Sequence, residues 1–321
     1  MGDEGEIRCA IVTGASGFVG AAVCRLLLSR NVKTIGVVRD AGKIPDDLVS
    51  DPGFESCVLD MSEYGSESTE MEKWVEADVL FHFAWAAPWG EGFSDYGVQY
   101  ENVRLSCDLM KRAAALGIKR FVFSGTYNQF EALELEVRHG AKPRMTTVYS
   151  TAKLAADLTL CTLAASFGIE YCSGLIAMAY GPGDRSSKLT NIVLHQLLAG
   201  ETPKLVGEDV PYDCVYIDDI ARAFVAIAEC GVPGTSYYVG HDSAETMGWW
   251  MRSFRDALAP DRSLQFGAFP YGGGVDFSQV DMGLLHRDTG FECVADVEQS
   301  VRTTAEWIAN NNPLGYDIPA R

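Results

Sequence analysis

Short apolar runs alternate with segments of helical periodicity along the first three quarters of the chain. A run of four to eight apolar residues between turn residues is typical of a buried strand. Strands that alternate with helices form a parallel sheet with helices on both faces. The pattern therefore predicts an α/β fold with a doubly wound parallel sheet. The expected strands are 7–13, 34–38, 56–59, 78–85, 119–123 and 169–178, and the expected helices include 100–116 and 149–167.

A glycine-rich turn follows the first expected strand and precedes a helical pattern. It reads Gly-Ala-Ser-Gly-Phe-Val-Gly from Gly14 to Gly20. In this context such a turn binds a dinucleotide. Gly14 permits the tight turn, Gly17 lets a pyrophosphate approach the backbone, and Gly20 lets the helix pack on the strand, with the phosphates at the helix amino-terminus. The alternative is a glycine-rich turn that binds nothing. The expected cofactor contacts here are Gly14, Ser16, Gly17, Phe18, Val19 and Gly20.

Tyr149 and Lys153 are four residues apart in an expected helix, so they lie one turn apart on the same face. A phenol titrates near ~10, and a nearby ammonium lowers its pKa because the positive charge stabilises the phenolate. The pair is therefore a candidate acid–base group. The alternative is an unrelated tyrosine and lysine on a solvated helix.

The GxxGxxG spacing, together with Tyr149 and Lys153, resembles the short-chain dehydrogenase/reductase superfamily. The chain length and the Tyr-Gly-Pro-Gly segment at 180–183 look like its extended branch, the NAD(P)-dependent epimerase/dehydratase family. The resemblance covers nearly the whole chain. It implies a Rossmann-type sheet and a smaller, interleaved C-terminal substrate domain. The expected division is a dinucleotide-binding domain at 1–178 with about 212–240, and a substrate-binding lobe at 179–211 and 241–321.

The resemblance also implies catalytic roles for three residues. Tyr149 exchanges a proton with a substrate alcohol or carbonyl. Lys153 lowers the pKa of the phenol and holds the nicotinamide ribose, while Thr126 hydrogen-bonds the same substrate oxygen. Thr126 stands where the family usually has a serine, so the alternative is a threonine in a turn that bonds its own backbone.

The type of cofactor depends on Arg39 and Asp40, at the end of the second expected strand. In a dinucleotide fold an acid there hydrogen-bonds the ribose 2′-hydroxyl, whereas an arginine accommodates a 2′-phosphate. Arg39 therefore favours NADP(H), and Asp40 at the ribose would favour NAD(H); alternatively, Arg39 is an ordinary surface charge. For Asp60, an ordinary post-strand turn competes with a contact to adenine. Further cofactor contacts that the resemblance implies are Asp60, Met61, Phe83, Ala84, Trp85, Asn102, Ser124, Tyr149 and Lys153.

The residues expected around the substrate come from the strand ends and from the second half of the chain. Trp85 and Trp89 belong to an apolar lip that lines the substrate side or only covers the core. Asn191 matches a residue that contacts the diphosphate of a nucleotide sugar in many relatives. The expected substrate contacts are Trp85, Trp89, Thr126, Tyr127, Asn128, Arg185, Asn191 and Tyr212.

Two departures from the family pattern weaken the assignment of a nucleotide diphosphate. Tyr212 stands where many nucleotide-sugar relatives carry an arginine, and Ile176 stands where the family usually has one. Arg185, Lys188 or Lys204 would then supply the positive charge.

The segment at 125–131, Gly-Thr-Tyr-Asn-Gln-Phe-Glu, looks most like the deoxysugar branch of the family, which reduces nucleotide-linked 4-keto-6-deoxyhexoses. A net reductase must exchange its nucleotide and usually uses NADPH, so Arg39 also favours reduction. The resemblance thus implies a ketoreductase acting on a nucleotide-linked keto-sugar. The alternatives are a nucleotide-sugar epimerase, a reductase of a smaller ketone or aldehyde, and a protein that senses NADP(H) without catalysis.

Composition narrows the remaining possibilities. The net charge of -18 argues against binding to nucleic-acid phosphates. No apolar run is long enough to span a bilayer, and the acidic start lacks the pattern of a signal peptide. The nine cysteines are scattered singly, which indicates a reduced, cytoplasmic compartment and no cysteine-bound metal. The resemblance implies a homodimer formed through the helices at 100–116 and 149–167.

Overall fold

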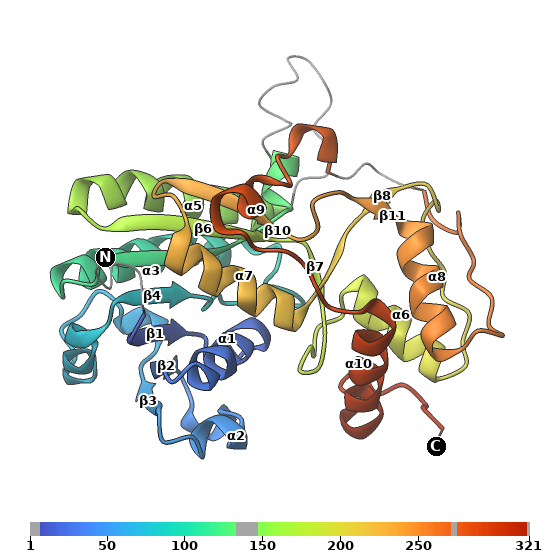
Figure 1. Ribbon diagram of the computed structural model, residues 1–321, viewed down its shortest axis with the longest axis horizontal. Helices are drawn as coiled ribbons and strands as arrows, with labels where there is room; N and C mark the ends of the chain where they lie inside the picture. The colour runs from blue at the N-terminus through green and yellow to red at the C-terminus, as the bar shows by residue number, and fades with distance from the viewer. Residues whose placement is uncertain (1–6, 133–146, 271–274, 320–321) are drawn as a thin grey trace.

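The computed structural model describes residues 7–132, 147–270 and 275–319. A seven-stranded sheet lies at its centre, in the order β10-β6-β5-β4-β1-β2-β3 (Figure 1). Each neighbouring pair of its strands is parallel. The chain thus starts in the middle, winds to one edge and then to the other, which confirms the predicted doubly wound α/β sheet. The strands are β1 (Cys9–Thr13), β2 (Lys33–Val38), β3 (Phe54–Val58), β4 (Val79–His82), β5 (Arg120–Thr126), β6 (Glu170–Ile176) and β10 (Thr235–Val239).

Helices cover both faces of the sheet (Figure 1), and a hydrophobic core lies on each face. Successive side chains of a strand point to opposite faces, so Val12 of β1 belongs to one core and Ile11 to the other. The first core contains residues of α1 and α7, and the second contains residues of α3 and α5. The elements of these layers are α1 (Phe18–Ser29), α3 (Tyr96–Ala115), α5 (Val148–Phe167) and α7 (Ile217–Cys230), with α2 (Asp46–Val49) and 3₁₀ helices at Ala41–Lys43, Met61–Glu63 and Thr69–Glu76 after the edge strands.

A third core lies beside the sheet, where α6, α8 and α10 gather (Figure 1). Its centre is built from Trp250 and Phe254 of α8, Leu194 of α6 and Val301 of α10. This separate core supports the expected division of the chain into two lobes, which stays a prediction. The elements around this third core are β7 (Met178–Tyr180), α6 (Leu189–Leu198), β8 (Pro211–Tyr212), β9 (Cys214–Tyr216), β11 (Glu245–Thr246), α8 (Met247–Leu258) and α10 (Val297–Asn311). A 3₁₀ helix (Phe277–Gln279) and α9 (Leu284–Thr289) pack instead on the first core, where α9 contacts α7 and β10.

Several predicted boundaries are wrong, each for a local reason. The strand expected at 169–178 is broken: β6 stops, and Met178 begins β7, which pairs with β9 instead of the main sheet. The strand β5 continues as far as Thr126, so Thr126 ends a strand and does not lie in a turn. The helix α3 begins at Tyr96, one turn earlier than predicted, because the Asp95 carboxylate caps it by accepting two backbone N–H groups.

Three negative findings apply to the described ranges. No helix there is long and apolar enough to cross a membrane. The nine cysteines all lie in these ranges, and each is a free thiol. No three His, Cys, Asp or Glu side chains of these ranges come together in a way that could hold a metal ion.

Candidate active site

A cavity of about 700 Å³ opens at the carboxyl ends of the central strands. Its wall is built from the glycine turn after β1, the end of β2, the loop after β4, the end of β5 and the start of α5. This is the edge at which parallel sheets bind their ligands. The residues singled out from the sequence that lie on this wall are Gly14, Ser16, Gly17, Phe18, Val19, Gly20, Arg39, Met61, Phe83, Ala84, Trp85, Trp89, Ser124, Thr126, Tyr127, Asn128, Tyr149, Lys153 and Lys188.

The glycine turn fits a dinucleotide pyrophosphate. Gly14 has a φ of +70°, and a Cβ there would lie 2.9 Å from the backbone nitrogen of Ala84, so only glycine is accommodated. A Cβ on Gly20 would collide with the carbonyl oxygen of Gly14. Gly17 is the N-cap of α1, and no side chain caps the first N–H groups of that helix. These donors stay available to a phosphate.

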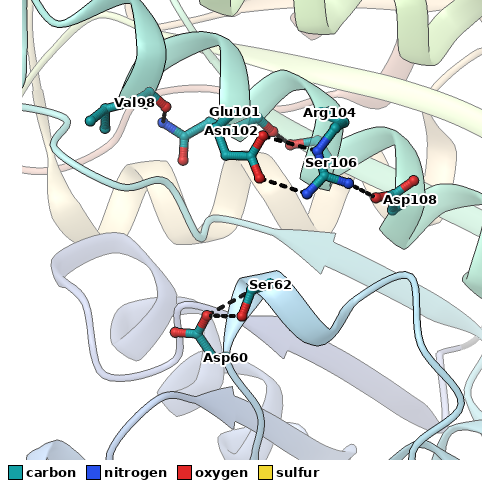
Figure 2. Close-up of polar contacts among 8 residues, drawn as sticks. All are labelled: Asp60, Ser62, Val98, Glu101, Asn102, Arg104, Ser106 and Asp108. Atoms are coloured by element: carbon teal, nitrogen blue, oxygen red, sulfur yellow. Dashed lines mark hydrogen bonds and ion pairs between the residues drawn. The ribbon is translucent and has the colours of Figure 1, made fainter.

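Three charged residues, Arg39, Asp40 and Asp60, follow the ends of β2 and β3. Arg39 lies on the cavity wall. Asp40 does not; its carboxylate accepts the Gly42 N–H at 2.9 Å and caps a 3₁₀ helix. Asp60 also lies off the wall. Its carboxylate accepts the hydroxyl and the backbone N–H of Ser62 at 2.7 and 3.0 Å (Figure 2), and these bonds lower the pKa of Asp60. Both carboxylates therefore accept hydrogen bonds within local turns and do not line the cavity.

Tyr149 lies in the first turn of α5, against two aromatic rings. Its ring stacks on Phe93 with the centroids 5.0 Å apart and meets Trp85 edge-on at 6.3 Å. Thr147 caps the helix by accepting a backbone N–H at 3.0 Å, which fixes the turn that carries the phenol. Burial raises the pKa of Tyr149 to about 12, and a hydrogen bond with Thr126 opposes this rise.

The ammonium of Lys153 points inward and not into solvent. Its Nζ donates to the Ser124 carbonyl oxygen at 2.7 Å and lies 3.9 Å from the ring centroid of Trp85 and 4.7 Å from that of Phe123. Only 4% of the residue is exposed. Burial lowers the pKa of Lys153 to about 7, while the charge of Asp157 acts to raise it.

The predicted effect of Lys153 on Tyr149 is wrong. The sequence predicted that the ammonium lowers the pKa of the phenol, but the pKa is raised. Both groups are buried, and burial disfavours the charged phenolate as well as the charged ammonium. Burial is the largest cause of the pKa shift at each residue, and neither residue is among the causes of the shift at the other.

Thr126 completes this group at the end of β5. Its backbone N–H donates to Oε1 of Gln129 at 3.0 Å, and its Oγ1 accepts the N–H of Asn128 at 3.4 Å. The Thr126 side chain also acts to lower the pKa of Tyr149. Tyr149, Lys153 and Thr126 thus share one cavity with the glycine turn.

His82 lies beneath the cavity at the end of β4, packed and neutral. The Ser106 hydroxyl donates to the Asn102 carbonyl at 2.7 Å, so its oxygen must accept the hydrogen on Nε2 of His82, 2.8 Å away. The other ring nitrogen, Nδ1, then accepts the hydroxyl of Thr13 at 2.8 Å, and the Thr13 oxygen accepts the Ala84 N–H at 3.2 Å. Burial lowers the pKa of His82 to about 3. The chain of bonds holds the start of the loop that lines the cavity.

A known protein family matches the part of the chain that forms this sheet and this site. Residues 10–240 match the model of the NAD dependent epimerase/dehydratase family. The chain belongs to this family. It is therefore an enzyme of the extended short-chain dehydrogenase/reductase group, with an NAD(P) nucleotide as its cofactor.

Individual members of the epimerase/dehydratase family resemble this chain over most of its length. A dTDP-glucose 4,6-dehydratase of Neisseria gonorrhoeae is 22% identical over 97% of this chain and 98% of its own. A 2-alkyl-3-oxoalkanoate reductase of Shewanella oneidensis is 28% identical over 75% of this chain and 64% of its own. The solved structure of a UDP-glucose 4-epimerase from Thermotoga maritima with UDP-glucose has the same fold, with a TM-score of 0.76 and 20% identity over 95% of this chain and 99% of that one.

Asn191, which the family pattern assigns to the substrate, lies off the cavity wall. Its amide donates to the carbonyl oxygens of Asp184 and Ser186 at 3.1 and 2.7 Å. Asn191 therefore holds a loop whose residues do reach the cavity. On this loop, Oδ2 of Asp184 and Oγ of Ser186 are buried without a hydrogen-bond partner among the described residues. Neither residue was predicted, because the path of this loop is not visible in a local pattern.

Two other predicted substrate residues also lie off the wall. The guanidinium of Arg185 lies over Trp307, with its carbon 5.7 Å from the ring centroid. Tyr212 is buried in the core beside the sheet, where its carbonyl oxygen accepts Nε1 of Trp250 at 3.2 Å. Lys188, another of the positive charges considered for a phosphate in this epimerase/dehydratase chain, does line the cavity.

The loop between β4 and α3 is held by two buried amides. Asn102 exchanges hydrogen bonds with the backbone of Ala86, at 2.7 and 3.0 Å, and also donates to a carbonyl of its own helix (Figure 2). It thus lies off the wall and acts on the loop. Gln99 accepts Nε1 of Trp85 at 2.8 Å and donates to two loop carbonyls at 2.9 and 3.0 Å. Gln99 and the stacking partner Phe93 were not predicted from the sequence.

Proposed function

We propose that this enzyme reduces the keto group of a nucleotide-linked 4-keto-6-deoxy sugar, with NADP(H) as its cofactor. The observation that carries the proposal is the grouping of Tyr149, Lys153 and Thr126 around the cavity that also holds the glycine turn. When bound there, the nicotinamide would supply the hydride. The side chains orient the carbonyl and deliver the proton.

Tyr149 is the proposed proton donor. A pKa of about 12 keeps its phenol protonated at neutral pH. An alkoxide that forms from the carbonyl is a far stronger base than a phenolate, so transfer of the proton to it is favourable. Thr126 offers its hydroxyl to the same oxygen, and Lys153, bonded to the Ser124 carbonyl, would hold the nicotinamide ribose.

The preference for NADP(H) is supported by the two residues at the end of β2. Arg39 borders the cavity, while the carboxylate of Asp40 is used in a cap. A guanidinium binds a phosphate through two parallel N–H donors, as the 2′-phosphate of NADP(H) requires. An acid that accepted the ribose 2′-hydroxyl of NAD(H) would have to come from elsewhere.

The nucleotide-linked substrate is supported by the far end of the cavity and by the relatives. Ser187 and Lys188 border the cavity where α6 begins, and Lys188 is the N-cap of that helix. An ammonium next to a helix amino-terminus favours a diphosphate. The similar dehydratase and epimerase carry names of nucleotide-sugar enzymes.

A reductase of a smaller, more apolar ketone is the second candidate. Trp85, Trp89 and Phe93 give the cavity an aromatic side. Tyr212 replaces the arginine that would pair with a phosphate, and the unpartnered carboxylate oxygen of Asp184 would repel one. One relative is named as a 2-alkyl-3-oxoalkanoate reductase.

Consumption of NADPH by the purified enzyme with a panel of carbonyl compounds tests the proposal, with NADH in parallel. We expect turnover with a dTDP-linked 4-keto-6-deoxy sugar and a preference for NADPH. Turnover of a 3-oxoacyl ketone alone would favour the second candidate. Interconversion of UDP-glucose and UDP-galactose without net loss of NADPH would favour an epimerase. Tight NADPH binding with no turnover of any compound would contradict a ketoreductase.

A further inference from the structure

A buried carboxylate lies one helical turn after Lys153. Asp157 is four residues further along α5, so the two side chains are neighbours on one face of the helix. Asp157 is 5% exposed and Lys153 is 4% exposed. A buried charge is costly unless an opposite charge and hydrogen bonds compensate for it. The proposed roles of Tyr149, Lys153 and Thr126 leave Asp157 without a function.

Within the described part of the chain, each hydrogen-bond partner of Asp157 donates to it. Its Oδ2 accepts Nε2 of Gln129 at 2.9 Å, and its Oδ1 accepts the hydroxyl of Tyr171 at 2.5 Å. The hydroxyl of Ser236 approaches the two oxygens at 3.1 and 3.3 Å. These donors come from the segment after β5, from β6 and from β10. Three donors around one side chain match an ionised carboxylate, which only accepts.

Gln129 connects this carboxylate to the cavity. Its Oε1 accepts the N–H of Thr126 at 3.0 Å, so the orientation of the amide is determined and its nitrogen must face Asp157. A Cβ on Gly125 would lie 2.6 Å from that Oε1, which means that the amide packs directly on the backbone of β5. A movement of Asp157 would therefore displace the end of the strand that carries Thr126.

The charge of Asp157 also acts on Lys153. The ammonium faces the Ser124 carbonyl and the rings of Trp85 and Phe123, none of which carries a charge. The titratable groups beside it are Tyr149 of its own helix and His82 of β4, both neutral at pH 7. The titratable group in contact with Asp157 is Tyr171 of β6, which Cys161 of α5 also influences. Burial favours the neutral amine, and Asp157 is the group that opposes this.

We propose that Asp157 is the counter-charge and positioning residue of this active site: its carboxylate balances the Lys153 ammonium and, through Gln129, holds Thr126 at the end of β5. The inference rests on the function proposed above, because that function gives Lys153 and Thr126 their roles in the reaction. It adds a residue that touches neither substrate nor cofactor.

The substitution Asp157→Asn tests the charge, because it keeps the shape of the side chain. Without the carboxylate the pKa of Lys153 falls further, so the ammonium is lost at lower pH. We expect the alkaline limb of kcat/KM to move down by about one pH unit, which is about a tenfold loss of activity on that limb. Competitive acetylation of Lys153 over a range of pH, read by mass spectrometry, reports the same shift without catalysis.

Two further variants separate charge from packing. Asp157→Glu keeps the charge, so the acetylation curve of Lys153 should stay close to that of the parent; equal shifts in the Glu and Asn variants would overturn the proposal. Ser236→Ala removes one donor but no charge, and we expect the parent pH profile.

The link to Thr126 has its own variant, which leaves the carboxylate in place. Gln129→Leu should lower kcat about tenfold, as the loss of one or two hydrogen bonds would, and leave the acetylation curve and the KM for NADPH unchanged. A parent kcat in this variant would overturn the positioning role. A fully active Tyr149→Phe enzyme would instead refute the proposed function. An inactive Tyr149→Phe enzyme with a parent-like Asp157→Asn enzyme would refute only this inference.

Discussion

At the scale of single residues, the phenol of Tyr149 has a high pKa and packs against two rings. The substitution Tyr149→Phe removes the proton and keeps the ring contacts with Phe93 and Trp85. A positioned proton donor contributes roughly 10²–10⁴-fold to a rate, so we expect kcat to fall by that factor. The dissociation constant for NADPH, measured by calorimetry, should change little, because the aromatic packing is retained. Full turnover would exclude Tyr149 as the donor.

A second prediction at the residue scale concerns Arg39 and the affinity for NADPH. Hydrogen bonds to a charged group contribute about 1.5–3 kcal/mol. Arg39→Ala should therefore weaken NADPH binding by about tenfold or more, and leave NADH binding nearly unchanged. Lys43→Ala is the matched control, because Lys43 is a nearby exposed cation that does not border the cavity. Equal losses of NADPH affinity in the two variants would point to general charge attraction and not to a 2′-phosphate contact.

At the scale of secondary-structure elements, His82 joins the end of β4 to α3 through Ser106. The imidazole stays neutral in the fold down to a pKa of about 3, whereas in the unfolded chain it takes up a proton near its ordinary pKa of 6.5. The unfolded state thus binds the additional proton between these values, and stability falls as the pH decreases through this window. The slope from this one group is at most about 1.4 kcal/mol per pH unit.

Urea unfolding at neutral and mildly acidic pH measures that slope. The variant His82→Gln keeps an amide donor and acceptor but has no group that titrates in this range. We expect its free energy of unfolding to be lower than that of the parent at pH 7 and to fall less steeply towards acid. Identical slopes would mean that His82 is protonated in the folded state.

The secondary-structure elements also show which features a local sequence pattern can predict. Gly14 and Gly20, or Tyr149 and Lys153, are so close in sequence that their spacing alone determines their geometry once the helix forms. The alternation of strands and helices likewise predicted the sheet. The raised pKa of Tyr149 could not be predicted, because it depends on burial by rings from another loop.

Residues in the second half of the chain show what a local sequence pattern could not predict. Asn191 and Arg185 were matched to the substrate by family position, yet in the structure Asn191 bonds to loop carbonyls and Arg185 lies over an indole. The direction of each side chain depends on the course of a loop between β7 and α6, which no periodicity encodes. Gln99 and Phe93 were missed for the same reason, because their partners are set by the fold of a long loop.

At the scale of the whole molecule, α3 and α5 pack against each other and leave large apolar side chains outside. Tyr96 and Tyr100 of α3 and Leu158 of α5 are all exposed. Burying these side chains against a second copy would remove apolar surface from water, and a twofold axis is the commonest symmetry of oligomers. We therefore expect a homodimer through these two helices, with a doubled mass in sedimentation equilibrium.

The substitution Leu158→Lys should shift that equilibrium towards the monomer, because it places a charge in the apolar contact. Val232→Lys is the matched control: Val232 is also an exposed aliphatic residue, but it lies in the turn before β10. A parent protein that sediments as a monomer at micromolar concentration would contradict the dimer.

The position of Trp85 has one more consequence. Its indole lies on the cavity wall, against the ammonium of Lys153 and the edge of Tyr149. Indole emits light in the band that reduced nicotinamide absorbs and oxidised nicotinamide does not. Energy absorbed at Trp85 would therefore pass to a reduced ring beside it and be re-emitted at longer wavelength. A nicotinamide bound beside Trp85 would thus make this indole an internal optical reporter of the redox state of the cofactor.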